Sequence, residues 1–192
     1  MGEIELILGC MFSGKSTELI RRIRRYKSIG KKVLSVNYLE DKRYGNNNIV
    51  THDKIKEDAL FVKNLQQIIT HENFQSSEII AINEGQFFSD LYNLVITFAD
   101  YYNKNVIICG LDGDYKRQPF GDILKLIPHS ESVIKLTALC KICNDGTKAA
   151  FTKRTSKSDD LILIGSEESY LPVCRKCYNI DNIERIGIEV AL

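Results

Sequence analysis

The sequence predicts an α/β protein in which a parallel sheet is covered by helices on both faces and is followed by a small cysteine-rich unit. Three observations lead to this prediction. Short apolar runs alternate with helical patterns up to about residue 137, as is typical of parallel sheets. A glycine-rich turn separates the first apolar run from the first helical pattern. Four of the six cysteines form two close pairs in the last third of the chain.

The first unit is a strand, a turn and a helix. Residues 3–8, Glu-Ile-Glu-Leu-Ile-Leu, have the short apolar run of a largely buried strand. After the turn, the apolar residues are spaced at i, i+1, i+4 and i+7, which indicates one face of a helix. We expect that helix to end near Gly30. These apolar positions are Leu19, Ile20, Ile23 and Tyr26.

The turn itself, Gly-Cys-Met-Phe-Ser-Gly-Lys-Ser at residues 9–16, matches the phosphate-binding P-loop pattern G-x-x-x-x-G-K-[ST]. Its backbone N–H groups and the helix N-terminus favour a bound phosphate. Lys15 would meet the β- and γ-phosphates and Ser16 would bind Mg²⁺. Because strand and helix flank the motif correctly, we interpret it as a nucleoside triphosphate site and not as a chance turn. The predicted phosphate-binding residues are Gly9, Cys10, Met11, Phe12, Ser13, Gly14, Lys15, Ser16 and Thr17.

Further elements follow in order. Strands are expected at residues 33–37, 78–82, 105–109 and 132–136, and helices at residues 56–70 and from the capping Ser89 to residue 102. The polar residues 39–51 predict a surface loop. Since ligands of such folds lie at the carboxyl ends of the strands, we expect Gly9, Glu84 and Asp112 to cluster there.

Glu84 is the candidate general base. It follows the third predicted strand and precedes Gly85, where a carboxylate can accept a proton from an attacking hydroxyl. The alternative is a solvated carboxylate at a strand end. Of the next two aromatic residues, Phe87 and Phe88, we expect one to lie in the core and the other to face a flat ring.

The paired cysteines indicate a structural zinc site. Cys140 with Cys143, and Cys174 with Cys177, would each present two thiolates from one tight turn, and two such turns complete a tetrahedron. Without a secretion signal, disulfides are the weaker interpretation, and a thioredoxin-like redox pair explains only one of the two units. Four protein ligands make a closed site, which supports the fold and performs no chemistry.

Composition excludes several classes of function. A formal net charge of +1 provides no general field for nucleic acid or a membrane surface, and the basic residues between 21 and 27 are interpreted as a solvated helix face. No apolar run approaches a membrane span and no targeting segment is recognisable at the N-terminus. We therefore expect a cytoplasmic protein.

From about residue 3 to residue 178 the chain carries a series of motifs that resembles the type II (cytosolic) thymidine kinases of animals, bacteria and large DNA viruses. The motifs are Gly-Cys-Met-Phe-Ser-Gly-Lys-Ser-Thr-Glu-Leu at residues 9–19, Asp-Lys-Arg-Tyr at 41–44, Thr-His-Asp at 51–53, Asn-Glu-Gly-Gln-Phe-Phe at 83–88, Leu-Asp-Gly at 111–113, Lys-Arg at 116–117, Pro-Phe-Gly at 119–121, Lys-Leu-Thr-Ala at 135–138, Thr-Lys-Arg at 152–154 and Cys-Arg-Lys-Cys-Tyr at 174–178.

The resemblance implies transfer of the γ-phosphoryl group of ATP to the 5′-hydroxyl of thymidine. It assigns the catalytic roles to Glu84 as base, Lys15 on the phosphates and Arg43 on the charge of the transferred group. It assigns Mg²⁺, directly or through water, to Ser16, Asp41 and Asn83. Deoxyuridine stays open as a second acceptor.

The resemblance also implies a RecA-like P-loop domain (residues 1–137), a zinc-ribbon domain with a "lasso" loop over the nucleoside (residues 138–178) and a C-terminal tail (residues 179–192). It further implies a homotetramer and feedback inhibition by thymidine triphosphate (dTTP). The residues that it places near the nucleoside are Met11, Phe88, Leu111, Tyr115, Phe120, Leu161, Ile162, Leu163, Ile164, Gly165 and Tyr170.

Two positions depart from the family pattern. Asn83 replaces the usual Asp, which keeps an oxygen ligand but loses a negative charge, so we expect a higher Mg²⁺ requirement. Tyr115 replaces a common Phe, and its hydroxyl needs a partner if it is buried. Parts of the sequence also fit three other functions. The P-loop would fit an ATPase motor, and the four cysteines would fit a zinc-ribbon nucleic-acid binder. Asn83 is the only indication of a nucleotide-binding regulator that has lost catalysis.

Overall fold

The computed structural model describes residues 1–40, 48–50, 55–155 and 169–186. Its centre is a six-stranded sheet with the strand order β5-β2-β6-β7-β1-β8, and all of its pairings are parallel. This arrangement confirms the predicted fold class. The strands are β1 (Ile4–Gly9), β2 (Val33–Tyr38), β5 (Leu60–Val62), β6 (Ile79–Ile82), β7 (Asn105–Gly110) and β8 (Ser132–Leu136).

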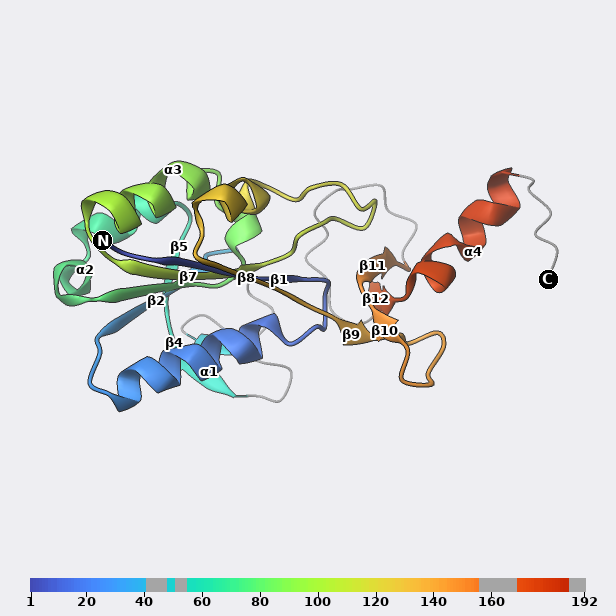
Figure 1. The fold of residues 1–192 in the computed structure, drawn as a ribbon, viewed down its shortest axis with the longest axis horizontal. Helices are drawn as coiled ribbons and strands as arrows, with labels where there is room; N and C mark the ends of the chain where they lie inside the picture. The colour runs from blue at the N-terminus through green and yellow to red at the C-terminus, as the bar shows by residue number, and fades with distance from the viewer. Residues whose placement is uncertain (41–47, 51–54, 156–168, 187–192) are drawn as a thin grey trace.

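The central strands are buried on both faces because successive side chains point to opposite sides of the sheet. In β1, Leu6 belongs to one core and Ile7 to the other. Helix α1 (Lys15–Ser28) covers one face and inserts Leu19, Ile20 and Ile23 into the second core. The other face is covered by α2 (Glu72–Ser76), α3 (Leu91–Ile96), the π-helical turn η3 (Thr97–Tyr101) and the 3₁₀ turns η1 (Leu65–Thr70) and η4 (Ile123–His129) (Figure 1).

The helix predicted over residues 56–70 is wrong. Those residues form β4 (Lys56–Asp58), β5 and the short η1. β5 pairs with β2 at the sheet edge, and β4 pairs with β3 (Asn48–Val50). The long-range backbone pairing overrides a weak local helical period.

The helix expected from Ser89 is formed by α3 and η3, but its N-cap position is Asp90. The carboxylate of Asp90 instead accepts hydrogen bonds from the backbone N–H groups of Leu65 (3.1 Å) and Gln66 (3.0 Å). It therefore satisfies the first turn of η1, which is a partner that the local sequence could not reveal.

A second unit lies beyond the carboxyl ends of the sheet strands (Figure 1). It consists of the antiparallel pair β9 (Ala138–Leu139) and β10 (Lys148–Ala149), the antiparallel pair β11 (Phe151–Arg154) and β12 (Tyr170–Val173), and α4 (Arg175–Ile186). The sequence carried no signal for α4. In the described part of the chain, no helix has the length and apolar character to cross a membrane.

The core makes a direct stability prediction. Phe98 has none of its surface exposed and packs 5.6 Å from Phe74, centroid to centroid. Phe98→Ala should lower the free energy of unfolding by about 3–5 kcal/mol, because a buried ring leaves a cavity. Tyr101→Ala, on the same helical segment but 79% exposed, should cost less than about 1 kcal/mol. Urea unfolding measures both values, and equal losses would contradict this assignment of the core.

Candidate active site

The predicted P-loop connects β1 to α1. Lys15 is the first residue of α1, and Gly14 is its N-cap in left-handed geometry with φ 81°. The Ser13 Oγ and the Lys15 Nζ both donate to the carbonyl oxygen of Cys10, at 2.8 Å and 2.6 Å. Both bonds close the loop onto the carbonyl oxygen of Cys10. Helix α1 begins at this loop, and the N-terminus of a helix favours a bound anion.

Asn83 lies next to this loop, as the sequence predicted. It is buried, and its Oδ1 accepts hydrogen bonds from Ser16 Oγ (3.1 Å) and Cys109 Sγ (2.9 Å). Its Nδ2 donates to Asn37 Oδ1 at 2.9 Å. The side-chain amide oxygen of Asn83 therefore points toward Ser16, the P-loop residue whose hydroxyl binds Mg²⁺ in such proteins. These two oxygens fit a magnesium site.

The thiol of Cys109 acts as a donor in this cluster. Its burial, followed by the negative charge of Glu84, raises the pKa of Cys109 to about 12. The thiol stays protonated at neutral pH and can hold the Asn83 oxygen. Burial also raises the pKa of the Cys10 thiol in the P-loop, so neither cysteine has the character of a nucleophile.

Glu84 follows β6 directly, and its backbone lies in the left-handed region with φ 55° and ψ 43°. Such a conformation is strained for a residue other than glycine and is found preferentially at functional sites. The carboxylate is half-buried, and Oε2 accepts a hydrogen bond of 2.6 Å from Gln86 Nε2. The structure thus brings a carboxylate and Asn83, which follow β6, and the P-loop, which follows β1, to the same edge of the sheet.

Two aromatic residues, Phe87 and Phe88, follow Glu84 closely in the chain. Phe87 is half-buried, stacks on Tyr38 (5.3 Å between centroids) and meets the edge of Phe120 (5.5 Å). Phe88, the residue that we predicted near the nucleoside, is only 1% exposed and belongs to the core. The two phenylalanines are therefore one core residue and one outward residue, and Phe87 is the one that offers a ring surface.

Tyr115 and Tyr170 meet through Arg154. The Arg154 guanidinium lies 4.0 Å from the centre of the Tyr115 ring, and its Nη2 donates to the Tyr170 hydroxyl at 2.6 Å. Among the described residues, the buried hydroxyl of Tyr115 has no hydrogen-bond partner. This hydroxyl is a polar group for which a ligand could supply the partner.

Met11 and Leu111 are held by their backbones. The N–H of Met11 donates to Thr152 Oγ1 of the second unit at 3.0 Å, and the N–H of Leu111 donates to Gln86 Oε1 at 2.9 Å. Thr152 and Gln86 were not among the predicted site residues. The predicted residues Asp41, Arg43, Leu161, Ile162, Leu163, Ile164 and Gly165 lie outside the described residues.

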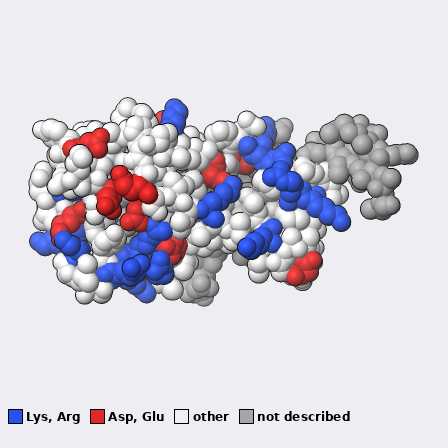
Figure 2. Space-filling model, in the orientation of Figure 1, with Lys and Arg blue, Asp and Glu red and all other residues white. Residues whose placement is uncertain are grey.

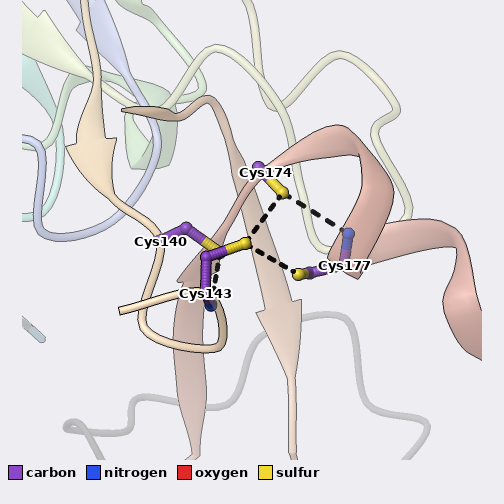
Figure 3. Close-up of side chains that lie close together, drawn as sticks. All are labelled: Cys140, Cys143, Cys174 and Cys177. Carbon is purple, nitrogen blue, oxygen red and sulfur yellow. Dashed lines mark hydrogen bonds between the residues drawn. The ribbon is translucent and has the colours of Figure 1, made fainter. Parts of the chain in front are cut away.

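The two cysteine pairs come together in the second unit (Figure 3). All four Sγ atoms lie within 4.8 Å of one another, and Cys143 Sγ is 3.8 Å from Cys174 Sγ and 3.4 Å from Cys177 Sγ. Four sulfurs about 2.3 Å from a tetrahedral zinc ion are about 3.8 Å apart. The backbone N–H of Cys143 points to Cys140 Sγ and that of Cys177 to Cys174 Sγ, each at 3.5 Å. The cluster therefore fits zinc.

The basic face of α1 is balanced by acidic residues. Figure 2 shows Lys and Arg next to Asp and Glu over α1, at the lower left of the molecule. Arg21 bonds to Glu18 at 2.6 Å, and Arg22 pairs with both Glu18 and Glu5. These ion pairs engage Arg21 and Arg22, two of the basic residues on this helix.

A parallel α/β sheet with a P-loop at its carboxyl edge defines the class of P-loop nucleotide-binding proteins. Within that class, the chain belongs to the thymidine kinase family, whose model matches residues 2–178. It is 43% identical to thymidine kinase 1 of Dictyostelium discoideum over 187 residues, which cover 95% of this chain and 80% of that protein.

Poxvirus proteins are similar at the same level. The chain is 46% identical to the thymidine kinase of Yaba monkey tumor virus, covering 92% of this chain and 94% of that protein. It is 45% identical to the thymidine kinase of vaccinia virus strain Western Reserve, covering 92% and 97%. The resemblance found in the sequence is thereby confirmed. Membership of this kinase family implies ATP as phosphoryl donor and Mg²⁺ as its metal.

Proposed function

We propose that this protein transfers the γ-phosphoryl group of ATP to the 5′-hydroxyl of thymidine, giving thymidine monophosphate, in the salvage of nucleosides. The observation that carries the proposal is the contact between Ser16 of the P-loop and Asn83, the residue immediately before the Glu84 carboxylate. This contact supports a triphosphate site and a base at one edge of the sheet. The family supports thymidine as the acceptor.

In this proposal the P-loop residues bind and orient the triphosphate. The N–H groups of the loop and the Lys15 ammonium hold the β- and γ-phosphates, and Ser16 and Asn83 hold Mg²⁺ together with Asp41. The bound Mg²⁺ supplies charge neutralisation across the phosphates. Arg43 adds a positive charge to the transferred group. Positioning and charge supply most of the rate enhancement in phosphoryl transfer.

Glu84 accepts the proton of the 5′-hydroxyl as the new O–P bond forms and the bond to the ADP leaving group breaks. Its backbone is left-handed and follows β6 directly. The nucleoside lies near Met11, Leu111, Tyr115, Phe120 and the lasso at residues 161–173 with Tyr170, and Phe87 joins them as the exposed ring of its pair. A closed lasso excludes water that would otherwise take the phosphoryl group.

We further propose zinc in the four-cysteine cluster, where it holds both ends of the lasso, and a division into residues 1–137, 138–178 and 179–192. The family also supports a cytoplasmic homotetramer that is inhibited by dTTP and binds neither nucleic acid nor membranes. Charge balance on α1 supports the absence of nucleic-acid binding.

The reaction is tested by incubating the protein with ATP, Mg²⁺ and thymidine, with deoxycytidine in parallel. We expect thymidine monophosphate as product. Glu84→Gln should lower kcat by about 10²- to 10⁴-fold, because the base is lost, while ATP binding measured by calorimetry is retained. A protein that binds ATP but makes no product across a wide range of Mg²⁺ would instead be a regulator that kept the pocket and lost the reaction.

The role of Asn83 is tested by Asn83→Asp. The added negative charge beside Ser16 should lower the Mg²⁺ concentration for half-maximal rate several-fold, because carboxylates bind this ion more strongly than amides. The control is Asn93→Asp, the same change at an exposed position of α3. An unchanged Mg²⁺ dependence in Asn83→Asp would refute a role of this residue at the metal.

The cysteine cluster is tested by elemental analysis of the purified protein, which should contain one zinc ion per chain. Cys143→Ala should lose the zinc and raise the KM for thymidine, because the lasso loses its anchor. Cys109→Ser removes a cysteine outside the cluster and should keep the zinc. If Cys143→Ala and wild type hold equal zinc, the proposed site is wrong.

A further inference from the structure

The side chain of Gln86 contacts both Glu84 and the backbone of Leu111. It lies in the 3₁₀ turn η2 (Gly85–Phe87) and is 4% exposed. Its amide nitrogen donates to Glu84 Oε2 at 2.6 Å, and its amide oxygen accepts from the N–H of Leu111 at 2.9 Å. A carboxylate requires a donor and an N–H requires an acceptor, so only one orientation of the amide satisfies both partners.

The surrounding backbone leaves Gln86 little space to move. A Cβ atom at Gly121 would lie 2.2 Å from the Gln86 carbonyl oxygen, and one at Gly110 would lie 2.5 Å from its Oε1. Gly121 also has a φ of +61°. Two glycines therefore permit the end of β7 and the turn at residue 121 to close on η2. Gln86 is clamped between three segments of the chain.

Glu84 has a side chain with three rotatable torsions, and one hydrogen bond removes much of that freedom. A general base must be correctly directed before the hydroxyl arrives. Gln86 is placed to provide that direction.

We propose that Gln86 is a positioning residue for phosphoryl transfer, which holds the Glu84 carboxylate in its reactive orientation and ties it to the segment that begins at Leu111. That segment carries Tyr115 and Phe120, two of the proposed nucleoside contacts. The position of the Glu84 carboxylate is thereby linked to the position of the nucleoside that accepts the phosphoryl group. This inference rests on the proposed role of Glu84 as the base.

Two substitutions separate the two hydrogen bonds. Gln86→Glu keeps an oxygen for the N–H of Leu111 but loses the donor to Glu84. Gln86→Met has a similar length and loses both bonds. Gln66→Met makes the same chemical change on the exposed face of η1 and is the matched control. For each variant, kcat and the KM for thymidine are measured with saturating ATP, and ATP affinity and thermal unfolding are measured alongside.

Loss of the donor should lower kcat, because the Glu84 carboxylate is no longer held in its reactive orientation. For Gln86→Met we expect roughly tenfold lower kcat and a higher KM for thymidine, because the bond to Leu111 is lost as well. Gln86→Glu should lower kcat by a similar factor but keep the KM for thymidine within about twofold of wild type, because its oxygen still accepts from Leu111. The affinity for ATP should stay within about twofold of wild type in both variants, since the P-loop is untouched.

A purely structural role would change kcat and the KM for thymidine together in both variants and would lower the temperature of unfolding. A wild-type kcat in both variants, with Glu84→Gln inactive, overturns the proposal for Gln86 alone. Activity in Glu84→Gln overturns the base assignment and the role of Gln86 with it. If Gln86→Met fails to fold, kcat and KM of Gln86→Glu decide.

Discussion

The parallel pairing of β6, β7 and β1 is the constraint on which the rest of this structure depends. Leu8 pairs with Gly110, and Ile82 pairs with Ile108, so the three strands end at nearly the same level. Each strand is then followed by a functional segment: the P-loop, the pair Asn83 and Glu84, and the segment from Leu111. Backbone hydrogen bonds between buried strands thus bring together residues that are far apart in the sequence. The short side-chain contacts of the site only refine that placement.

The uncharged hydrogen-bond partners of Asn83 suit a neutral amide side chain at this position. The groups that hydrogen-bond to it are the Ser16 hydroxyl, the Cys109 thiol and the Asn37 amide, and none of them carries a charge at neutral pH. A buried carboxylate among such partners would lose hydration without a compensating cation until the metal arrives. The amide avoids that cost and retains an oxygen ligand.

The second unit packs against the P-loop and is hydrogen-bonded to it. Cys10 packs in the same apolar cluster as Cys140, Val173 and Cys174, and its Sγ approaches the carbonyl oxygen of Ala149 at 3.3 Å. The backbone of Met11 is bonded to Thr152. A change in the cysteine cluster would therefore be transmitted to the phosphate loop through packed side chains and one backbone hydrogen bond. Two sites that are distant in the sequence share one structural support.

The sequence by itself determined the features that depend on neighbouring residues. The P-loop needs eight consecutive residues, each cysteine pair needs one tight turn, and alternating apolar runs predict a parallel sheet because burial on both faces leaves them continuous. The tertiary structure alone decided the rest. Residues 56–62 became strands because pairing partners were available. Phe88 is buried and Phe87 only half-buried because of the way in which η2 packs, which the local sequence does not show. Gln86 lies within the motif at residues 83–88, but that motif does not reveal what its side chain contacts. Its contacts with Glu84 and Leu111 arise only when two strand ends meet, since packing over long sequence separations is not encoded in any local pattern.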